Sequence, residues 1–160
     1  MKKEILKVLE KDSRLTSAQI AAMLGISEEE VERTIKECED EGLILGRLTL
    51  VDWDRAGEEL VTALIEVKVT PQRGDGFDRI AERIYQYEEV ESLYLMSGAY
   101  DLAVLISGRT LKEVSTFVSS RLATIDGVVS TATHFILKKY KDKNIPFTTQ
   151  PEQQERMMFC

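Results

Sequence analysis

The residues best suited to binding a small molecule lie in the segment Ser-Gly-Ala-Tyr-Asp at 97–101. Gly98 can adopt a positive φ without a Cβ penalty, and Asp101 can accept hydrogen bonds from nearby backbone N–H groups. A loop of this kind presents backbone donors and a carboxylate together, which would suit a small zwitterion such as an amino acid. The alternative is an ordinary hairpin turn, because Gly and Asp are common in turns.

A second group of charged residues lies on the segment from Ser27 to Asp40. At 100° per residue, a helix here has one apolar face and one charged face. The apolar face carries Val31, Ile35 and Cys38, and the charged face carries Glu29, Arg33, Lys36 and Asp40. Only Arg33 and Lys36 are cationic among many glutamates, and glutamate repels phosphate. Two interpretations stay open: a helix that reads DNA, or a protein-interaction and dimerisation module.

The residues give little support for an enzyme. The single histidine, His134, is better explained as an imidazole packed against its neighbours than as a catalytic base. No Cys/His cluster has the spacing of a metal site, and no Gly-rich loop opens a helix at a phosphate site. We therefore expect no catalytic residues, no metal and no cofactor.

The composition indicates a soluble globular protein of one medium or two small domains, with 160 residues, 43% of them hydrophobic and 31% charged. No apolar run approaches the roughly 20 residues that span a bilayer. The start of the chain does not read as a secretory signal, and Cys38 and Cys160 suggest no disulfide framework, so we expect a cytoplasmic protein. Residues 1–60 carry nine Lys/Arg and fifteen Asp/Glu, a net charge of −6, which counts against tight non-specific DNA binding.

The first 60 residues predict a small helical domain. An amphipathic helix begins near residue 5. A second helix begins at Thr16, which has Gln19 in the capping-box position, and it ends at Gly25. Ser27 caps a third helix that ends at Gly42, after which Leu43 and Ile44 are expected to return to the core. Two short helices joined by a Gly-containing turn form a helix-turn-helix, whose second helix enters the major groove.

The rest of the chain alternates strands and helices. Strands are predicted at 60–70, on both sides of the turn at 97–101, and at 128–140; helices are predicted at 77–85 and 111–123. The order β-α-β-β-α-β is the ferredoxin-like arrangement, which leaves one sheet face uncovered, and a second copy of the chain is the simplest cover. The fold class is therefore α+β, with a winged-helix-like helix-turn-helix at 1–45, an extended arm at 46–59 and the βαββαβ domain at 60–160. Residues 156–159 are apolar enough for a further short strand.

The whole pattern resembles the Lrp/AsnC family of transcription regulators. The resemblance rests on residues 24–27, on the helix and turn at 31–44, on the turn at 97–102 and on the final strand at 129–133. It implies a DNA-binding regulator that dimerises through the βαββαβ domain, assembles further, and binds an amino acid near the Gly-x-x-Asp turn. The effector residues that it implies are Gly98, Ala99, Tyr100, Asp101, Ser130, Thr131 and Thr133.

The same resemblance gives a set of DNA-contacting residues. These are Ser17, Ser27, Glu29, Arg33 and Lys36. The sequence departs from the family in the first turn of the reading helix, where Glu28, Glu29 and Glu30 replace small polar residues. We therefore expect DNA binding that is weak and strongly salt-dependent. The alternative function is a ligand-sensing or assembly protein of the same fold in which the acidic helix has lost DNA binding.

Overall fold

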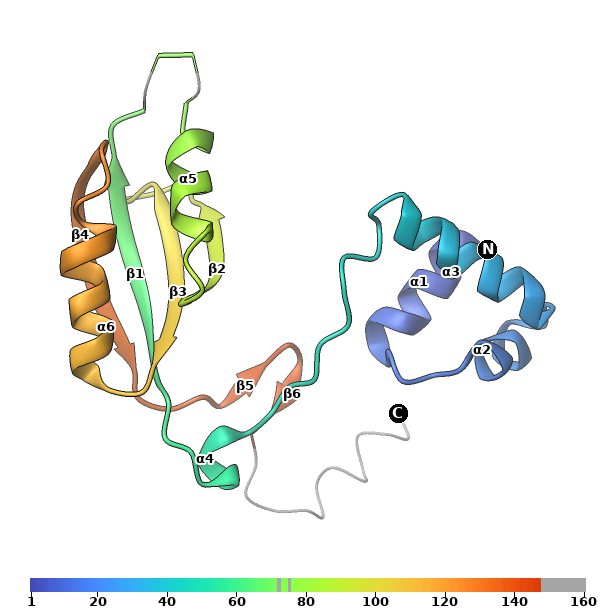
Figure 1. The fold of residues 1–160 in the computed structure, drawn as a ribbon. Coiled ribbons are helices and arrows are strands. Elements are labelled where there is room, and N and C mark those ends of the chain that lie inside the picture. Colours follow the sequence, from blue (N-terminus) through green and yellow to red (C-terminus); the bar gives the residue numbers. More distant parts are fainter. Residues whose placement is uncertain (72, 75, 148–160) are drawn as a thin grey trace. The chain divides into compact units, whose positions relative to one another are not determined.

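The computed structural model describes residues 1–71, 73–74 and 76–147. These divide into two compact units, with the division between Leu50 and Val51, and each unit is described by itself. Figure 1 shows helices alone in the first unit and a sheet with covering helices in the second. In the described part of the chain, no helix is long and apolar enough to cross a membrane.

The first unit is built from α1 (Lys2–Lys11), α2 (Ser17–Leu24) and α3 (Glu28–Asp40). Each helix contributes its apolar stripe to one small core. The fully buried residues of that core are Ile5, Ile20, Ala21 and Val31, with Val8, Leu9, Leu15, Leu24, Ile26 and Ile35 packed around them. The predicted helix-turn-helix is confirmed.

The ends of these helices follow the predicted capping signals. The Thr16 hydroxyl accepts a hydrogen bond from Gln19 N, and the Gln19 side chain accepts one from Thr16 N, which completes the capping box. Gly25 ends α2 with a φ of +68°, a left-handed conformation that glycine adopts without strain. These local interactions satisfy backbone groups that a short helix leaves unpaired, and they set the sharp turn between α2 and α3.

Two details of the predicted core are wrong. Thr34 is buried on the inner face of α3 together with Val31 and Cys38, and its hydroxyl donates to Glu30 O at 2.7 Å. This bond to the preceding turn satisfies the hydroxyl, so a polar residue occupies a core position. Leu43 does not return to the core, since its side chain is 54% exposed.

The beginning of the second unit contains one short helix, α4 (Trp53–Ala56), within the predicted extended arm at 46–59. The Asp52 carboxylate accepts a hydrogen bond from Arg55 N at 3.2 Å and so begins the helix at its N-cap. Gly57 then ends it with a φ of +88°. Residues 45–50, in contrast, form neither helix nor strand, and Leu45 and Leu48 are exposed.

The second unit is a four-stranded sheet with helices on one face (Figure 1). The strands are β1 (Val61–Val69), β2 (Val90–Leu95), β3 (Leu102–Gly108) and β4 (Val128–Ile136), in the spatial order β2-β3-β1-β4. All neighbouring pairs are antiparallel. The helices are α5 (Asp78–Tyr85) and α6 (Leu111–Phe117), which continues into a π-helical segment, η1 (Val118–Leu122). The βαββαβ order is confirmed, whereas the π-helical turn was not predicted.

Alternation along the strands separates the two faces of the sheet. The covered face carries the core residues of β1 and β3, which are Ala63, Ile65, Val67, Val69, Leu102, Val104 and Ile106. They pack against the inner residues of the helices, Ile80, Ile84, Val114, Phe117, Val118 and Leu122. The opposite face has no covering element in the described part of the chain, and its side chains include Leu64, Glu66, Tyr94, Leu105 and His134.

The last predicted strand is shorter than expected. It ends at Ile136, which pairs with Thr62, so only Val61 of β1 lies beyond the last pair, and it has no partner on β4. A hairpin of β5 (Lys141–Asp142) and β6 (Ile145–Pro146) comes next, and Lys143 and Asn144 both have positive φ at its tip. Positive φ at both central residues is the mark of a type I′ turn. The strand predicted at 156–159 lies outside the described residues.

Candidate DNA-reading helix and effector site

The predicted DNA-contacting residues lie at the beginnings of α2 and α3 and along the outer face of α3. Ser17 is the first residue of α2 and is half-buried. Ser27 is the N-cap of α3, and its Oγ accepts from Glu30 N at 3.2 Å while the side chain stays exposed. Because that hydrogen bond uses the oxygen as acceptor, the hydroxyl proton remains free to be donated.

The outer face of α3 is organised as the periodicity predicts. Glu29, Arg33 and Lys36 are exposed, opposite the buried Val31 and Cys38. Arg33 is 68% exposed and its Nε lies 3.9 Å from Glu37 Oε1, a weak contact one turn further along the helix. Lys36 has no ion-pair partner among the described residues. Both cations are therefore available to an external anion.

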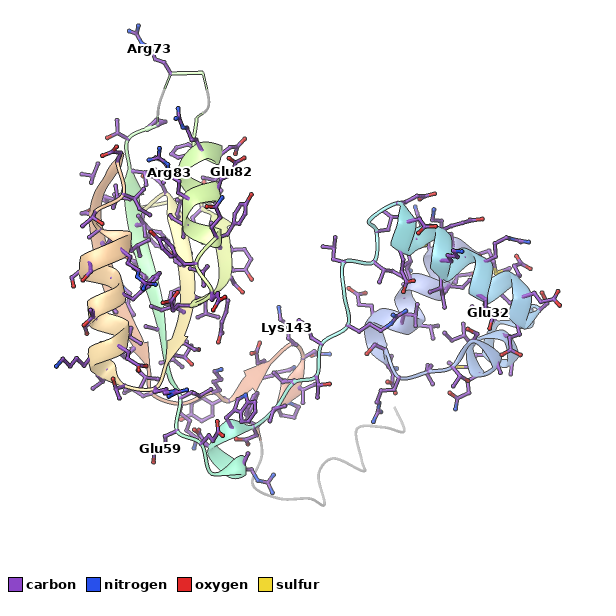
Figure 2. All side chains as sticks on the ribbon, in the orientation of Figure 1. Glu32, Glu59, Arg73, Glu82, Arg83 and Lys143 are labelled. Carbon is purple, nitrogen blue, oxygen red and sulfur yellow. The ribbon has the colours of Figure 1, made fainter. Side chains whose placement is uncertain are left out.

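Acidic residues surround these two cations. Glu28, Glu29 and Glu30 occupy the first turn of α3, where they favour the positive end of the helix dipole. Glu32, labelled in Figure 2, is exposed on the same helix. The first turn is also the part of a reading helix that approaches the bases most closely. The helix is thus stabilised by charges that oppose the approach of DNA.

Other cations of the first unit are held by acidic neighbours. Arg47 Nη2 lies 2.8 Å from Glu39 Oε1, and Lys2 Nζ pairs with Glu41 at the end of α3. Lys3, Lys7 and Lys11 follow one another at four-residue spacing on α1, are exposed, and have no ion-pair partner in the described part of the chain. These three lysines add positive charge to the first unit, whose reading helix α3 carries only two cations.

The loop before α2 contains a tightly held ion pair. Arg14 Nε and Nη2 donate to the two oxygens of Asp12, each at 2.9 Å, and Arg14 N donates to Asp12 Oδ1 at 3.0 Å. These hydrogen bonds lower the pKa of Asp12 to about 2, and the carboxylate raises the pKa of Arg14. The pair fixes the connection that leads into α2.

The turn at 97–101 is held by its own Asp101. One carboxylate oxygen, Oδ2, accepts a hydrogen bond from Val69 N at 2.9 Å, and Asp101 N donates to Val67 O at 3.0 Å. Asp101 O in turn accepts from Met96 N at 2.8 Å, which closes the connection between β2 and β3. Register pairing between β1 and β3 ends at Val67 and Leu102, so the Asp101 carboxylate replaces a missing strand neighbour.

The remaining residues of the turn face solvent. Gly98 has a φ of +152°, and a Cβ added there would meet nothing within 4 Å. Ala99 is exposed and Tyr100 is half-buried. Asp101 Oδ1 has no hydrogen-bond partner in the described part of the chain. The turn therefore offers open space and one unused carboxylate oxygen, but within one chain it forms no enclosed site.

The predicted effector residues of β4 do not lie together. Thr131 and Thr133 pair with Val67 and Ile65, which places them on the covered face of the sheet, whereas Ser130 pairs with Lys68 on the opposite face. Since adjacent strands lie about 4.8 Å apart, Thr131 is about 10 Å from Leu102 with β1 between them. One small ligand within a single chain does not contact this whole set together with the turn.

Two clefts are present elsewhere on the second unit. One, of about 310 Å³, lies between α5 and the edge strand β2 and is lined by Phe77, Tyr85 and Leu95 among others. The other, of about 530 Å³, lies beside α6 and η1 and is lined by residues that include Glu89, Lys112 and Arg121. Neither cleft is lined by residues 97–101. The second cleft was missed because its residues, all but Glu89 within 106–121, follow no motif.

Comparison with known proteins identifies both units. Residues 62–146 match the model of the Lrp/AsnC ligand binding domain, and residues 1–44 match the winged helix-turn-helix DNA-binding model. The chain belongs to the Lrp/AsnC family of transcription regulators. It is a DNA-binding regulator of this type, and the predicted family and α+β fold are both confirmed.

Individual relatives agree with this assignment. The chain is 52% identical over 147 residues to an uncharacterized HTH-type transcriptional regulator, YugG, of Bacillus subtilis, covering 91% of this chain and 89% of the relative. It is 33% identical to the HTH-type transcriptional regulator LrpA of Pyrococcus horikoshii, covering 87% and 96% of the two chains. These relatives bear names of transcriptional regulators rather than of enzymes.

Solved structures share the fold at low sequence identity. The leucine response regulatory protein LrpA of Mycobacterium tuberculosis has a TM-score of 0.74 at 22% identity, over 91% of this chain and 97% of that one. A transcriptional regulator of Neisseria meningitidis in complex with L-Met has a TM-score of 0.71 at 24% identity, over 90% and 92% of the two chains. Both similarities extend across the two units of this Lrp/AsnC chain.

Proposed function

We propose that this chain is an oligomeric transcription regulator whose DNA binding is weak per subunit and is modulated by an amino acid. The observation that carries the proposal is the outer face of α3, where exposed Arg33 and Lys36 stand on an otherwise complete helix-turn-helix. Each phosphate contact made by such a cation releases counterions, so affinity falls with salt.

Five residues are proposed to contact DNA. Arg33 and Lys36 supply charge from the outer face of α3, and Ser17 and Ser27 supply hydroxyls from the starts of two helices. Glu29 lies on the same face as the cations and has the chemistry to accept a hydrogen bond from cytosine N4. Because two cations per subunit give little affinity, several subunits must engage one DNA for tight binding.

The effector is proposed to bind at the turn that contains Gly98, Ala99, Tyr100 and Asp101, where a second subunit completes the site. Support comes from the exposure of this turn, from its absence from the lining of the two clefts described above, and from the match to a ligand binding domain. The structural neighbour from Neisseria meningitidis is described with bound L-Met, which points to an amino acid. Ser130, Thr131 and Thr133 would then contribute from β4 of one or another subunit.

The open face of the sheet is proposed to pair with a second copy. A row of residues crosses it in register, with Tyr94, Ala103, Glu66 and Ala132 side by side. Tyr94 is 53% exposed and Ile136 is also exposed, so apolar area remains uncovered in one chain.

We propose that residues 1–45 bind DNA, that residues 46–59 form the arm, and that residues 60–160 bind the effector and form the oligomer. As a DNA-binding regulator, the protein is expected to act in the cytoplasm.

The experiment is fluorescence anisotropy of the full chain against DNA from upstream of its own gene. We expect saturable binding that weakens as salt rises and that changes when one amino acid from a pool is added. Light scattering on the same sample establishes the oligomer. A well-folded oligomer that does not bind at low salt would contradict direct DNA recognition and favour a ligand-sensing or assembly protein.

A further inference from the structure

The cleft beside α6 and η1 has the features of a second ligand site. It encloses about 530 Å³ and lies at the end of β3 that carries Gly108. The turn at 97–101 precedes the other end of that strand. At about 3.4 Å per residue, Gly108 is roughly 24 Å from Asp101. A molecule in the cleft therefore does not contact the effector turn of the same chain.

The charges of the cleft come in both signs. Arg121 Nη1 donates to Glu89 Oε1 at 2.7 Å, and the guanidinium lies 5.7 Å from the centre of the Tyr87 ring. Arg121 is thus held in place while its other N–H groups stay available. Lys112 lines the same cleft and has no partner among the described residues.

Two carboxylates, Glu89 and Glu113, line the same cleft. Glu113 uses Oε2 to accept from Arg109 N at 2.7 Å, and Glu89 uses Oε1 for Arg121. Within the described chain, Glu113 Oε1 and Glu89 Oε2 have no hydrogen-bond partner. A simple anion would be repelled by these two groups, and a simple cation by Lys112 and Arg121. A molecule with one positive and one negative group can pair with both the carboxylates and the cations of the cleft.

A π-helical turn contributes to this lining as an independent observation. The bond from Ala123 N to Val118 O, at 2.8 Å, spans five residues, and η1 carries Ser120 and Arg121 into the cleft. Such turns are rare because they pack poorly, and they concentrate at functional sites. Ser120 and Thr116 add exposed hydroxyls to the lining.

We propose that the cleft beside α6 and η1 binds an α-amino acid or a zwitterion of similar size. Its carboxylate pairs with Lys112 and Arg121, and its ammonium group pairs with the free oxygens of Glu89 and Glu113. The apolar floor formed by Ile106 and Phe117 lies beneath the ligand side chain. This site goes beyond the proposed function, since it requires neither DNA nor a second subunit.

The test is a titration of the full chain with each standard L-amino acid in turn, followed by backbone amide chemical shifts. We expect one amino acid to shift Ser120 and Arg121, and its affinity to fall about ten-fold or more in Lys112→Gln, which removes a charge-assisted hydrogen bond. Thr116→Phe fills the cleft from an exposed position and should abolish those shifts. Lys139→Gln, an exposed lysine outside the cleft, is the matched control and should bind as the parent chain does.

Three results would overturn this site. They are shifts confined to residues 97–101, the same affinity in both cleft variants as in Lys139→Gln, or no amino acid binding at all. The first of these results would support amino acid binding at the proposed effector turn and contradict binding in the cleft. DNA binding is measured separately by anisotropy without amino acid, so its result does not depend on any of these three outcomes.

Discussion

Asp101 Oδ2 accepts a hydrogen bond from Val69 N at 2.9 Å, across 32 positions of the sequence. The bond joins the turn before β3 to the end of β1, where the pairing of β1 with β3 has already stopped. Asp101 therefore has a structural function in the free chain, whatever it contributes to an effector. A loss of effector response in an Asp101 variant does not by itself identify a ligand contact.

Asp101→Ala should destabilise the second unit. Removal of the carboxylate leaves the partly buried Val69 N–H without its acceptor, which costs about 1–3 kcal/mol. Urea unfolding followed by circular dichroism measures the difference. Asp101→Asn is the matched control, since it keeps an acceptor oxygen and should lose less. Equal stability of Asp101→Ala and the parent chain would show that this bond contributes nothing.

Gly98→Ala should also lower stability, by about 1 kcal/mol, because a φ of +152° strains any residue with a Cβ. No atom lies within 4 Å of the added methyl group, so the effect comes from the backbone alone. Gly46→Ala serves as control, since that glycine has open space and no positive φ. A thermal melt that places both variants at the same midpoint would argue against strain at the turn.

Lys36→Ala should weaken DNA binding at every sequence tested and reduce the salt dependence. Loss of one phosphate contact lowers the slope of log K against log salt by about 0.9 per subunit engaged. Anisotropy at several salt concentrations measures both quantities. Lys139→Ala, a lysine of the second unit, should leave the slope unchanged. An unaltered slope in Lys36→Ala would remove this residue from the interface.

Glu37→Gln should act in the opposite direction. Glu37 Oε1 lies 3.9 Å from Arg33 Nε. Neutralising this carboxylate removes the anion that competes with DNA phosphate for the Arg33 guanidinium, and it also lowers the negative charge of α3. We expect tighter binding by a few-fold at low salt and a smaller gain at high salt, as charge interactions are screened. Weaker binding in this variant would show that Glu37 itself contacts the DNA or orients Arg33 for it.

The Asp12–Arg14 pair predicts a change of stability in acid. The hydrogen bonds lower the pKa of Asp12 to about 2 in the folded chain, below its ordinary value near 3.9. A lowered pKa means that the contribution is present above the ordinary value and is lost as pH falls toward 2. Unfolding curves of the parent chain and of Asp12→Asn should differ at pH 6 and converge near pH 2. A constant difference across this range would contradict the assignment.

Helix boundaries and the order of helices and strands along the chain were predictable because they depend on local signals. Thr16 with Gln19, Ser27, Gly25 and the alternation of β1 each act over a few residues, and the structure uses all of them. The resemblance of the whole pattern then gave the family, which the comparisons confirm.

The features that the sequence did not reveal depend on contacts between distant segments. Nothing near Asp101 indicates that Val69 N lacks a partner on β3, since this follows from where β1 and β3 stop pairing. The length of β4 likewise depends on where β1 begins. The division of Ser130 from Thr131 and Thr133 needed only the strand period, which places neighbours on opposite faces.

The pairing of Thr62 with Ile136 brings the first strand to enter the sheet beside the last one to leave it. Residues paired in this way have Cα atoms about 5 Å apart. The sheet and its helices thus form a module whose two connections emerge side by side, an arrangement that tolerates insertion into a loop of another protein or exchange of the attached domain. Recombination can therefore attach a different DNA-binding unit to this domain without changing the strand pairing of its sheet.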